Sequence, residues 1–254
     1  MKKIFFLLAA GSFVFAGCTK TSVDTEADLS TGREAELPVQ RNCYTAEVYQ
    51  EQLKADPSLA QKTAAIERFT KEFADNPSAY RLVNGVIEIP VVFNVIYNTA
   101  VQNISNAQLQ SQVDVLNEDF AATNTDYNAS NVYNGVKAGE INIRFVLDAV
   151  VRKSSTKKSW RTDDAMKFAS SGGINATSPT TKLNIWVVNK MVAQGSTILG
   201  YAQFPGGATA TDGVVLGYNF TGRTGSVSAP YNKGRTATHE VGHWLNLRHI
   251  WGDA

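Results

Sequence analysis

The stretch Thr238–His249 reads THEVGHWLNLRH and contains all three histidines of the 254-residue chain. His239 and His243 are four residues apart, so on a helix they lie on one face and can present two imidazole nitrogens to a single metal ion. Glu240 lies beside them, where its carboxylate can take a proton from a metal-bound water and deliver it to the leaving amine of a peptide bond. The stretch therefore predicts a metal site for hydrolysis, with Glu240 as general base and acid.

His249 is the expected third ligand, but it can reach the same metal only if the helix ends before it. Six residues of continuous helix would rotate it away from the face that carries His239 and His243. Asn246 lies where a left-handed residue would end the helix and turn the chain back, and asparagine tolerates that conformation. Three imidazole nitrogens and one open position favour Zn²⁺ over Ca²⁺ or Mg²⁺.

Upstream of this stretch the sequence alternates between strand and helix patterns. A helix is expected at 105–120, where Ser105 and Gln108 form a capping box and Ile104 and Leu109 occupy hydrophobic-staple positions. Strands are expected at 87–97, 141–151, 183–188 and 213–218, with a shorter one at 199–204. Because a strand, a helix and a strand follow one another, the first crossover should be parallel. The sequence predicts an α/β (α+β) fold with a mixed, mostly parallel twisted sheet, a backing helix and an active-site helix.

The N-terminus is expected to be an export signal. Met1-Lys2-Lys3 supplies positive charge ahead of a short apolar run, which predicts a signal peptide over 1–17. Cys18 follows Ala16-Gly17 as in the lipobox of bacterial lipoproteins, so it should be acylated. Residues 18–40 are then a flexible tether. These features predict an exported lipoprotein of the cell envelope or outer membrane, which stays on the cell or is released from it. Its lipid anchor is the only contact with a membrane that the sequence predicts.

A small helical segment is expected over 41–82, ahead of the main body. Pro57 suits a first helical position behind Asp56, and apolar residues follow at helical spacing. Those apolar residues are Leu59, Ile66, Phe69 and Phe73. Acylation of Cys18 would leave Cys43, just before this segment, as a single thiol.

Charge and composition exclude several classes of partner. The chain has 24 Lys and Arg against 23 Asp and Glu, a formal charge of +1. This net charge is too small to attract nucleic acid or an anionic membrane surface by electrostatics. No run after residue 17 is apolar enough to span a bilayer. Its 43% hydrophobic content suits one large or two small globular domains.

The motif resembles that of the metzincin metallopeptidases, HExxHxxGxxH, with Asn246 in place of glycine. Three flanking stretches resemble the pappalysin-like (cytophagalysin) branch of that family: IPVVFNVIYN at 89–98, LNIWVVN at 183–189 and LGYAQFPGG at 199–207. The resemblance covers 41–254. It implies a zinc endopeptidase acting on polypeptides, with 83–254 as the upper catalytic subdomain built on a five-stranded sheet.

The resemblance also implies roles for residues outside the motif. Gly200, Tyr201, Ala202 and Gln203 would form the edge strand that lines the cleft and pairs with an extended substrate. Residues 41–82 would be a pro-segment whose Cys43 fills the position of the catalytic water, keeping a precursor latent. A buried, inert Cys43 is the alternative. Packing of Leu59, Ile66 and Phe69 against the body would hold the thiolate in place until a cut between about Asp75 and Glu88, near Arg81. Calcium is a further cofactor that the family allows, with no residues assigned.

One element of the family pattern is absent from the sequence. Metzincins carry a methionine turn after the third histidine, whereas Met1, Met166 and Met191 all precede it. We therefore expect a truncated chain that lacks the lower subdomain. A non-catalytic metal-binding surface lipoprotein is the first alternative. A thermolysin-type enzyme is the second, but too few residues follow His243 to supply its glutamate ligand.

Overall fold

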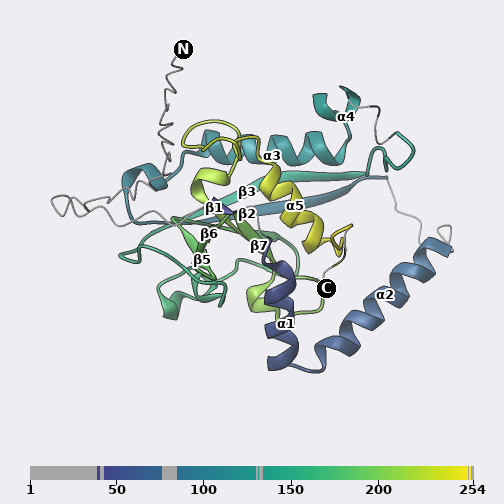
Figure 1. Ribbon diagram of the computed structural model, residues 1–254, viewed down its shortest axis with the longest axis horizontal. Coiled ribbons are helices and arrows are strands. Elements are labelled where there is room, and N and C mark those ends of the chain that lie inside the picture. Colours follow the sequence, from purple (N-terminus) through teal and green to yellow (C-terminus); the bar gives the residue numbers. More distant parts are fainter. Residues whose placement is uncertain are drawn as a thin grey trace, which may run out of the picture. The chain divides into compact units, whose positions relative to one another are not determined.

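In the computed structural model, which describes residues 39–40, 43–75, 85–129, 131, 134–250 and 252, five strands form the central sheet (Figure 1). Their order is β3-β2-β4-β8-β7. Four of them are parallel, and β7 runs antiparallel to β8 at the edge. Their bounds are β2 Ile87–Tyr97, β3 Ile143–Ser154, β4 Leu183–Val188, β7 Gly200–Ala202 and β8 Val214–Gly217. The expected mixed, mostly parallel sheet is confirmed.

Local sequence explains how the strands are placed. Every residue of β4 is buried, as expected for the central strand of a parallel sheet covered on both faces. Pro90 lies in β2 and has no backbone N–H. Since β2 pairs with β4 only from Val91 onward, the missing donor costs no hydrogen bond to β4. β3 begins two residues later than expected and continues to Ser154 because it pairs with β2 along its whole length.

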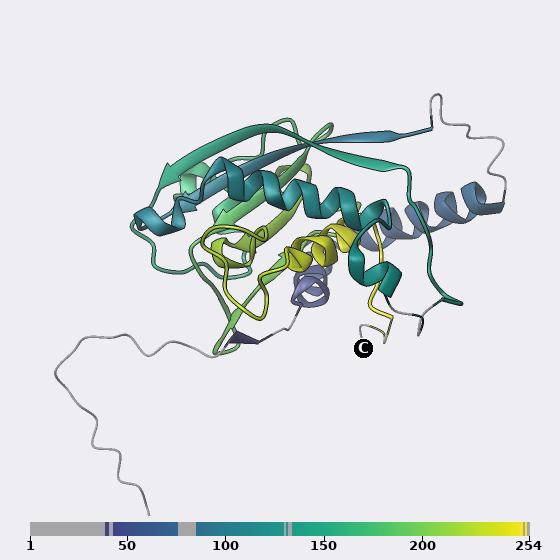
Figure 2. The same ribbon diagram turned by 90° about the horizontal axis from the view of Figure 1, so that it is seen from above.

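Helices α3 (Asn106–Phe120) and α5 (Arg235–Trp244) cover one face of the sheet (Figures 1 and 2). Ser105 caps α3 by accepting a hydrogen bond from the backbone of Gln108 at 3.2 Å. The Gln108 side chain does not complete the capping box and instead donates to the Tyr218 and Thr221 carbonyls. Leu116 of α3 shares a buried core with Ala237 and Val241 of α5, which fixes α5 against the sheet.

The other face of the sheet carries a second core and a small three-stranded sheet. Strands β1 (Val39–Gln40), β6 (Ser196–Ile198) and β5 (Met191–Ala193) form this sheet in that order. β1 pairs with β6, so the last two residues of the expected tether belong to the folded body. A single-sequence pattern could not reveal β1, because two residues carry no periodicity.

The N-terminal helical segment is two helices, α1 (Thr45–Ala55) and α2 (Leu59–Asp75). The chain breaks at Asp56, whose carboxylate accepts from the Ser58 N–H at 3.0 Å. Leu59 is buried, as expected, whereas Phe69 and Phe73 are 54% and 39% exposed, so the Phe69 side chain is less covered than expected. The middle of α2 also faces the body: Ile66 lies close to Gly206, and the Glu67 carboxylate accepts a 2.9 Å hydrogen bond from the Asn246 side chain.

Shorter helices connect these elements. They are α4 (Thr125–Ala129) and the 3₁₀ turns at Ala100–Gln102, Ala165–Lys167, Ala169–Ser171, Thr209–Thr211 and Tyr218–Phe220. Within the described part of the chain, no helix combines the length and apolar character needed to cross a bilayer. The expected signal peptide, Cys18, the tether up to residue 38 and Arg81 lie outside the described residues.

Candidate metal centre

The end of α5 brings the third histidine back toward the first two. Asn246 has φ of 74°, the left-handed conformation expected of it. The Asn246 N–H donates to the His243 carbonyl at 2.8 Å, and the Leu247 N–H donates to the Gly242 carbonyl at 2.9 Å. These two bonds form a Schellman motif, which ends the helix and reverses the chain toward His249.

The three histidine side chains converge through their Nε2 atoms. The Nε2 of His243 lies 3.1 Å from that of His239 and 3.1 Å from that of His249, and the remaining separation is 3.3 Å. Nitrogens bound to one tetrahedral zinc ion at about 2.0–2.1 Å would lie about 3.3–3.4 Å apart, so the triangle fits zinc. The Nδ1 of His243 lies 2.7 Å from the Leu247 carbonyl; a hydrogen bond there fixes the tautomer that offers Nε2 to a metal.

Cys43 supplies a fourth ligand atom to the same cluster. Its sulfur and the three histidine nitrogens all lie within 4.8 Å of one another. Three imidazoles and a thiolate are a closed, four-ligand set of the kind that zinc accepts. In this conformation the thiol, 196 residues before His239 in sequence, lies beside the three imidazole nitrogens.

Glu240 is buried beside the cluster and is held by the N-terminal segment. Its carboxylate is 2% exposed and accepts a 3.0 Å hydrogen bond from the Thr45 hydroxyl, while the Cys43 sulfur lies at 3.6 Å. Burial raises the pKa of Glu240 to about 8, against the opposing effect of these two bonds. Burial and the neighbouring Glu240 charge raise the pKa of the Cys43 thiol, whereas a bound zinc ion would lower it.

The edge strand β7 lies against Glu240 and is already hydrogen-bonded on its outer side. A Cβ at Gly200 would come within 3.2 Å of the Glu240 side chain and 2.9 Å of the Val215 carbonyl, which explains the glycine. The Ala202 N–H donates to the Thr45 hydroxyl at 2.9 Å, so helix α1 occupies an outward-facing main-chain donor of the edge strand. Tyr201 is fully buried and points into the second core, so its side chain does not line the cleft.

Known proteins share this sequence and architecture. A family model described as "Pregnancy-associated plasma protein-A" (Peptidase_M43) matches residues 174–253. An extracellular metalloprotease of Colletotrichum graminicola is 33% identical over 224 residues, covering 78% of this chain and 68% of the relative. The chain belongs to the pappalysin-like metallopeptidases. It spans only 55–60% of three other fungal extracellular metalloproteases, at 29% identity.

Two solved structures of mirolysin from Tannerella forsythia show the same pappalysin-like fold. Mature mirolysin, in complex with a cleaved peptide, is 45% identical with a TM-score of 0.62, and the match covers 67% of each chain. Promirolysin is 38% identical with a TM-score of 0.65, covering 85% of this chain and 71% of its own. The additional coverage by promirolysin corresponds to about 46 residues of this chain.

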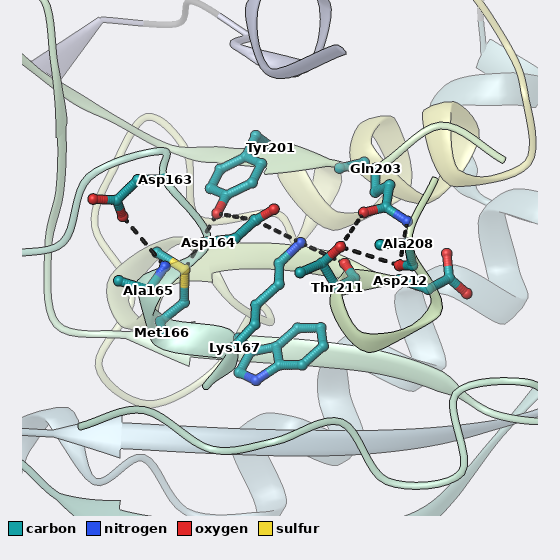
Figure 3. A network of polar contacts seen from close by, with 12 residues as sticks. Asp163, Asp164, Ala165, Met166, Lys167, Tyr201, Gln203, Ala208, Thr211 and Asp212 are labelled. Atoms are coloured by element: carbon teal, nitrogen blue, oxygen red, sulfur yellow. Dashed lines mark hydrogen bonds and ion pairs between the residues drawn. The ribbon is translucent and has the colours of Figure 1, made fainter. Parts of the chain in front are cut away.

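A fully buried lysine lies beneath the edge strand of this pappalysin-like chain (Figure 3). The Lys167 ammonium donates to the Thr211 carbonyl at 2.7 Å and pairs with the Asp164 carboxylate at 2.9 Å. It lies 5.3 Å and 5.2 Å from the ring centroids of Trp186 and Tyr201. The Tyr201 hydroxyl donates to the same Asp164 oxygen at 2.8 Å, so the network anchors β7 from below.

The same network continues toward the metal-binding helix. The Gln203 amide oxygen accepts from the Thr211 hydroxyl at 2.6 Å and from Gln52 of α1 at 3.1 Å. The Asp212 carboxylate accepts from the Trp244 indole N–H of α5 at 3.1 Å, and burial raises its pKa. Gln203 thus joins the edge strand, the turn after it and the N-terminal segment.

Sequence reasoning brought His239, Glu240, His243, His249 and Cys43 together, but it missed two parts of the site. Thr45 follows Cys43 by two residues, and its dual contact with Ala202 and Glu240 depends on the tertiary fold. Lys167 stands in a stretch without periodicity, where a lysine reads as a surface residue. Neither position carried a motif that would have identified it.

Proposed function

We propose that the chain forms the zinc-binding part of an exported zinc endopeptidase that cleaves polypeptides and is made as a latent precursor. The convergence of three Nε2 atoms beside the buried Glu240 carboxylate carries this proposal. When bound, zinc would lower the pKa of the attacking water and polarise the scissile carbonyl. His239, His243 and His249 would hold it.

Glu240 would move the proton in this reaction. It is adjacent to His239 on α5, outside the ligand triangle, and Gly200 lets β7 approach it closely. A carboxylate at this position can accept a proton from the attacking water and return it to the departing amine. The main chain of Gly200–Gln203 would align the substrate next to it by strand addition.

Latency would come from residues 41–82 acting as a pro-segment. Cys43 would occupy the fourth metal position, and Thr45 would hold Glu240 and the Ala202 N–H. The mirolysin comparisons support a pro-segment of about this length, because the pro form matches about 46 residues more of this chain than the mature form does. A cut between residues 75 and 88 would release both contacts.

Export would follow from residues 1–17 as signal peptide and acylation of Cys18. Residues 18–38 would be the tether to the membrane, since residues 39–40 form β1. The fungal relatives are named extracellular metalloproteases, which supports export in general. The lipid anchor rests on the sequence Ala16-Gly17-Cys18 alone. Radiolabelled palmitate should label the parent protein and not Cys18→Ala.

The catalytic assignment is tested with Glu240→Ala in the complete natural protein after maturation. Zinc content should stay near one per chain while peptidase activity falls by several orders of magnitude, since base and acid catalysis both pass through this carboxylate. Glu140→Ala, an exposed glutamate ahead of β3 and outside the expected cut region, is the matched control and should keep full activity. Retained turnover in Glu240→Ala would remove it from the mechanism. A zinc-loaded parent that cleaves no unfolded protein would favour a non-catalytic metal-binding lipoprotein.

The latency assignment is tested with Cys43→Ala in the full precursor. Removing the thiol should release activity or self-cleavage without any change at the histidines. If the variant stays as latent as the parent, coverage of the site by α1 and α2 is the better explanation, and the thiol only packs.

A further inference from the structure

Phe204 and Arg248 form a stacked pair beside the metal ligands. Phe204 follows β7 and is 2% exposed, and its ring lies 5.4 Å from the ring of His243 in an edge-to-face arrangement. The guanidinium carbon of Arg248, the residue before His249, lies 3.8 Å from the centroid of the Phe204 ring. Neither residue binds metal in the proposed site.

Tyr49 of helix α1 covers this pair. Its ring is edge-to-face with Phe204, with centroids 5.6 Å apart and planes at 80°, and the Arg248 guanidinium carbon lies 5.1 Å from its centroid. The Tyr49 hydroxyl donates to Thr63 of α2 at 3.0 Å, which holds the ring in place. If residues 41–82 leave as a pro-segment, both Phe204 and Arg248 lose this cover.

Tyr49 and Thr45 are four residues apart on α1 and therefore share one helix face. Thr45 accepts from the Ala202 N–H as the carbonyl of an added strand would. Two residues further along the edge, Tyr49 places an aromatic ring on Phe204. One face of α1 thus places a hydrogen-bond acceptor on Ala202 and an aromatic side chain on Phe204, two residues further along the chain.

We propose that Phe204 and Arg248 form a substrate subsite that binds an aromatic side chain, and that Tyr49 occupies it in the latent chain. This proposal deepens the proposed peptidase function and rests on it. A planar guanidinium stacks on aromatic faces, and Phe204 offers an edge-to-face partner to the same ring. An acidic side chain would pair with Arg248 but would leave the Phe204 ring without a matching surface.

The contact itself is tested in the full chain without reference to activity. Hydrogen exchange of the α1 amides should be about tenfold faster than in the parent for Tyr49→Leu and for Arg248→Gln. The double variant should also be only about tenfold faster than the parent, because the two side chains act as a pair. Tyr49→Phe, which loses only the bond to Thr63, is the control for the hydroxyl. Fully additive effects of Tyr49→Leu and Arg248→Gln would overturn the pairing.

The subsite is then tested in the matured natural enzyme with a peptide series. A single tyrosine is moved along the positions flanking the cleaved bond, with leucine and glutamate as comparators. At one position tyrosine should raise kcat/KM about tenfold over leucine, and Arg248→Gln or Phe204→Leu should abolish that ratio. Equal kcat/KM for tyrosine and leucine at every position, or a preference for glutamate, would overturn the proposal. Cleavage of no peptide at all would instead overturn the proposed function.

Discussion

The Thr45 hydroxyl is the contact on which closure of the N-terminal segment should depend most. It accepts from the Ala202 N–H at 2.9 Å and donates to Glu240 at 3.0 Å, with Thr45 fully buried and Glu240 2% exposed. Thr45→Val keeps the shape and removes the hydroxyl. It leaves a buried N–H without an acceptor, at a cost of about 1–3 kcal/mol, and removes a hydrogen bond to a carboxyl group that is mostly neutral at pH 7, worth about 0.5–1.5 kcal/mol.

Taken together and allowing for non-additivity, we expect α1 to open about 3 kcal/mol more easily, or about a hundredfold more often. Hydrogen–deuterium exchange of the α1 amides in the zinc-loaded full chain measures this opening directly. Thr45→Ser, which keeps the hydroxyl, should exchange within about threefold of the parent. The same is expected of Thr70→Val, because the exposed Thr70 hydroxyl donates to the Ile66 carbonyl within α2. Exchange of Thr45→Val within about threefold of the parent would refute the reasoning.

Three further outcomes are expected. Lys167→Met should lower the free energy of unfolding, measured by urea titration, by about 3 kcal/mol, because it breaks a buried ion pair. Lys182→Met breaks a half-exposed ion pair and should cost less than about 1 kcal/mol, and equal losses in the two variants would contradict this. Asn246→Gly should be near neutral and Asn246→Ala should cost about 1 kcal/mol, since only alanine strains the left-handed turn; the reverse order in the same titration would exclude that turn. N-terminal sequencing of the active form should find a start between residues 75 and 88, with Arg81 the expected marker, and a fully active form that starts at Cys18 would argue against a pro-segment.

Much of the sheet and the metal site could be predicted because the signals were local. The spacing of His239, Glu240 and His243 needs only one helical turn, and the left-handed Asn246 follows from the requirement that His249 reach the same point. Strands such as β4 could be predicted from their apolar composition. The parallel pairing of β2 and β3 followed from the helix between them.

Other features depended on contacts between distant segments. The exposure of Phe69 shows that helical spacing identifies an apolar stripe but not what covers it. Gln108 fitted a capping box, yet two carbonyls more than a hundred residues away compete for its side chain. Lys167 is buried because Asp164 and the Thr211 carbonyl satisfy its charge, and no window of sequence contains those three groups with their geometry.

Zinc-edge X-ray absorption of the purified full-length chain tests the central claim most directly. The account predicts one zinc ion bound by three imidazole nitrogens and one sulfur at about 2.3 Å, with the sulfur lost in Cys43→Ala and one nitrogen lost in His249→Ala. A chain that binds no zinc, or whose zinc shows no sulfur ligand and is unchanged by His249→Ala, would contradict it.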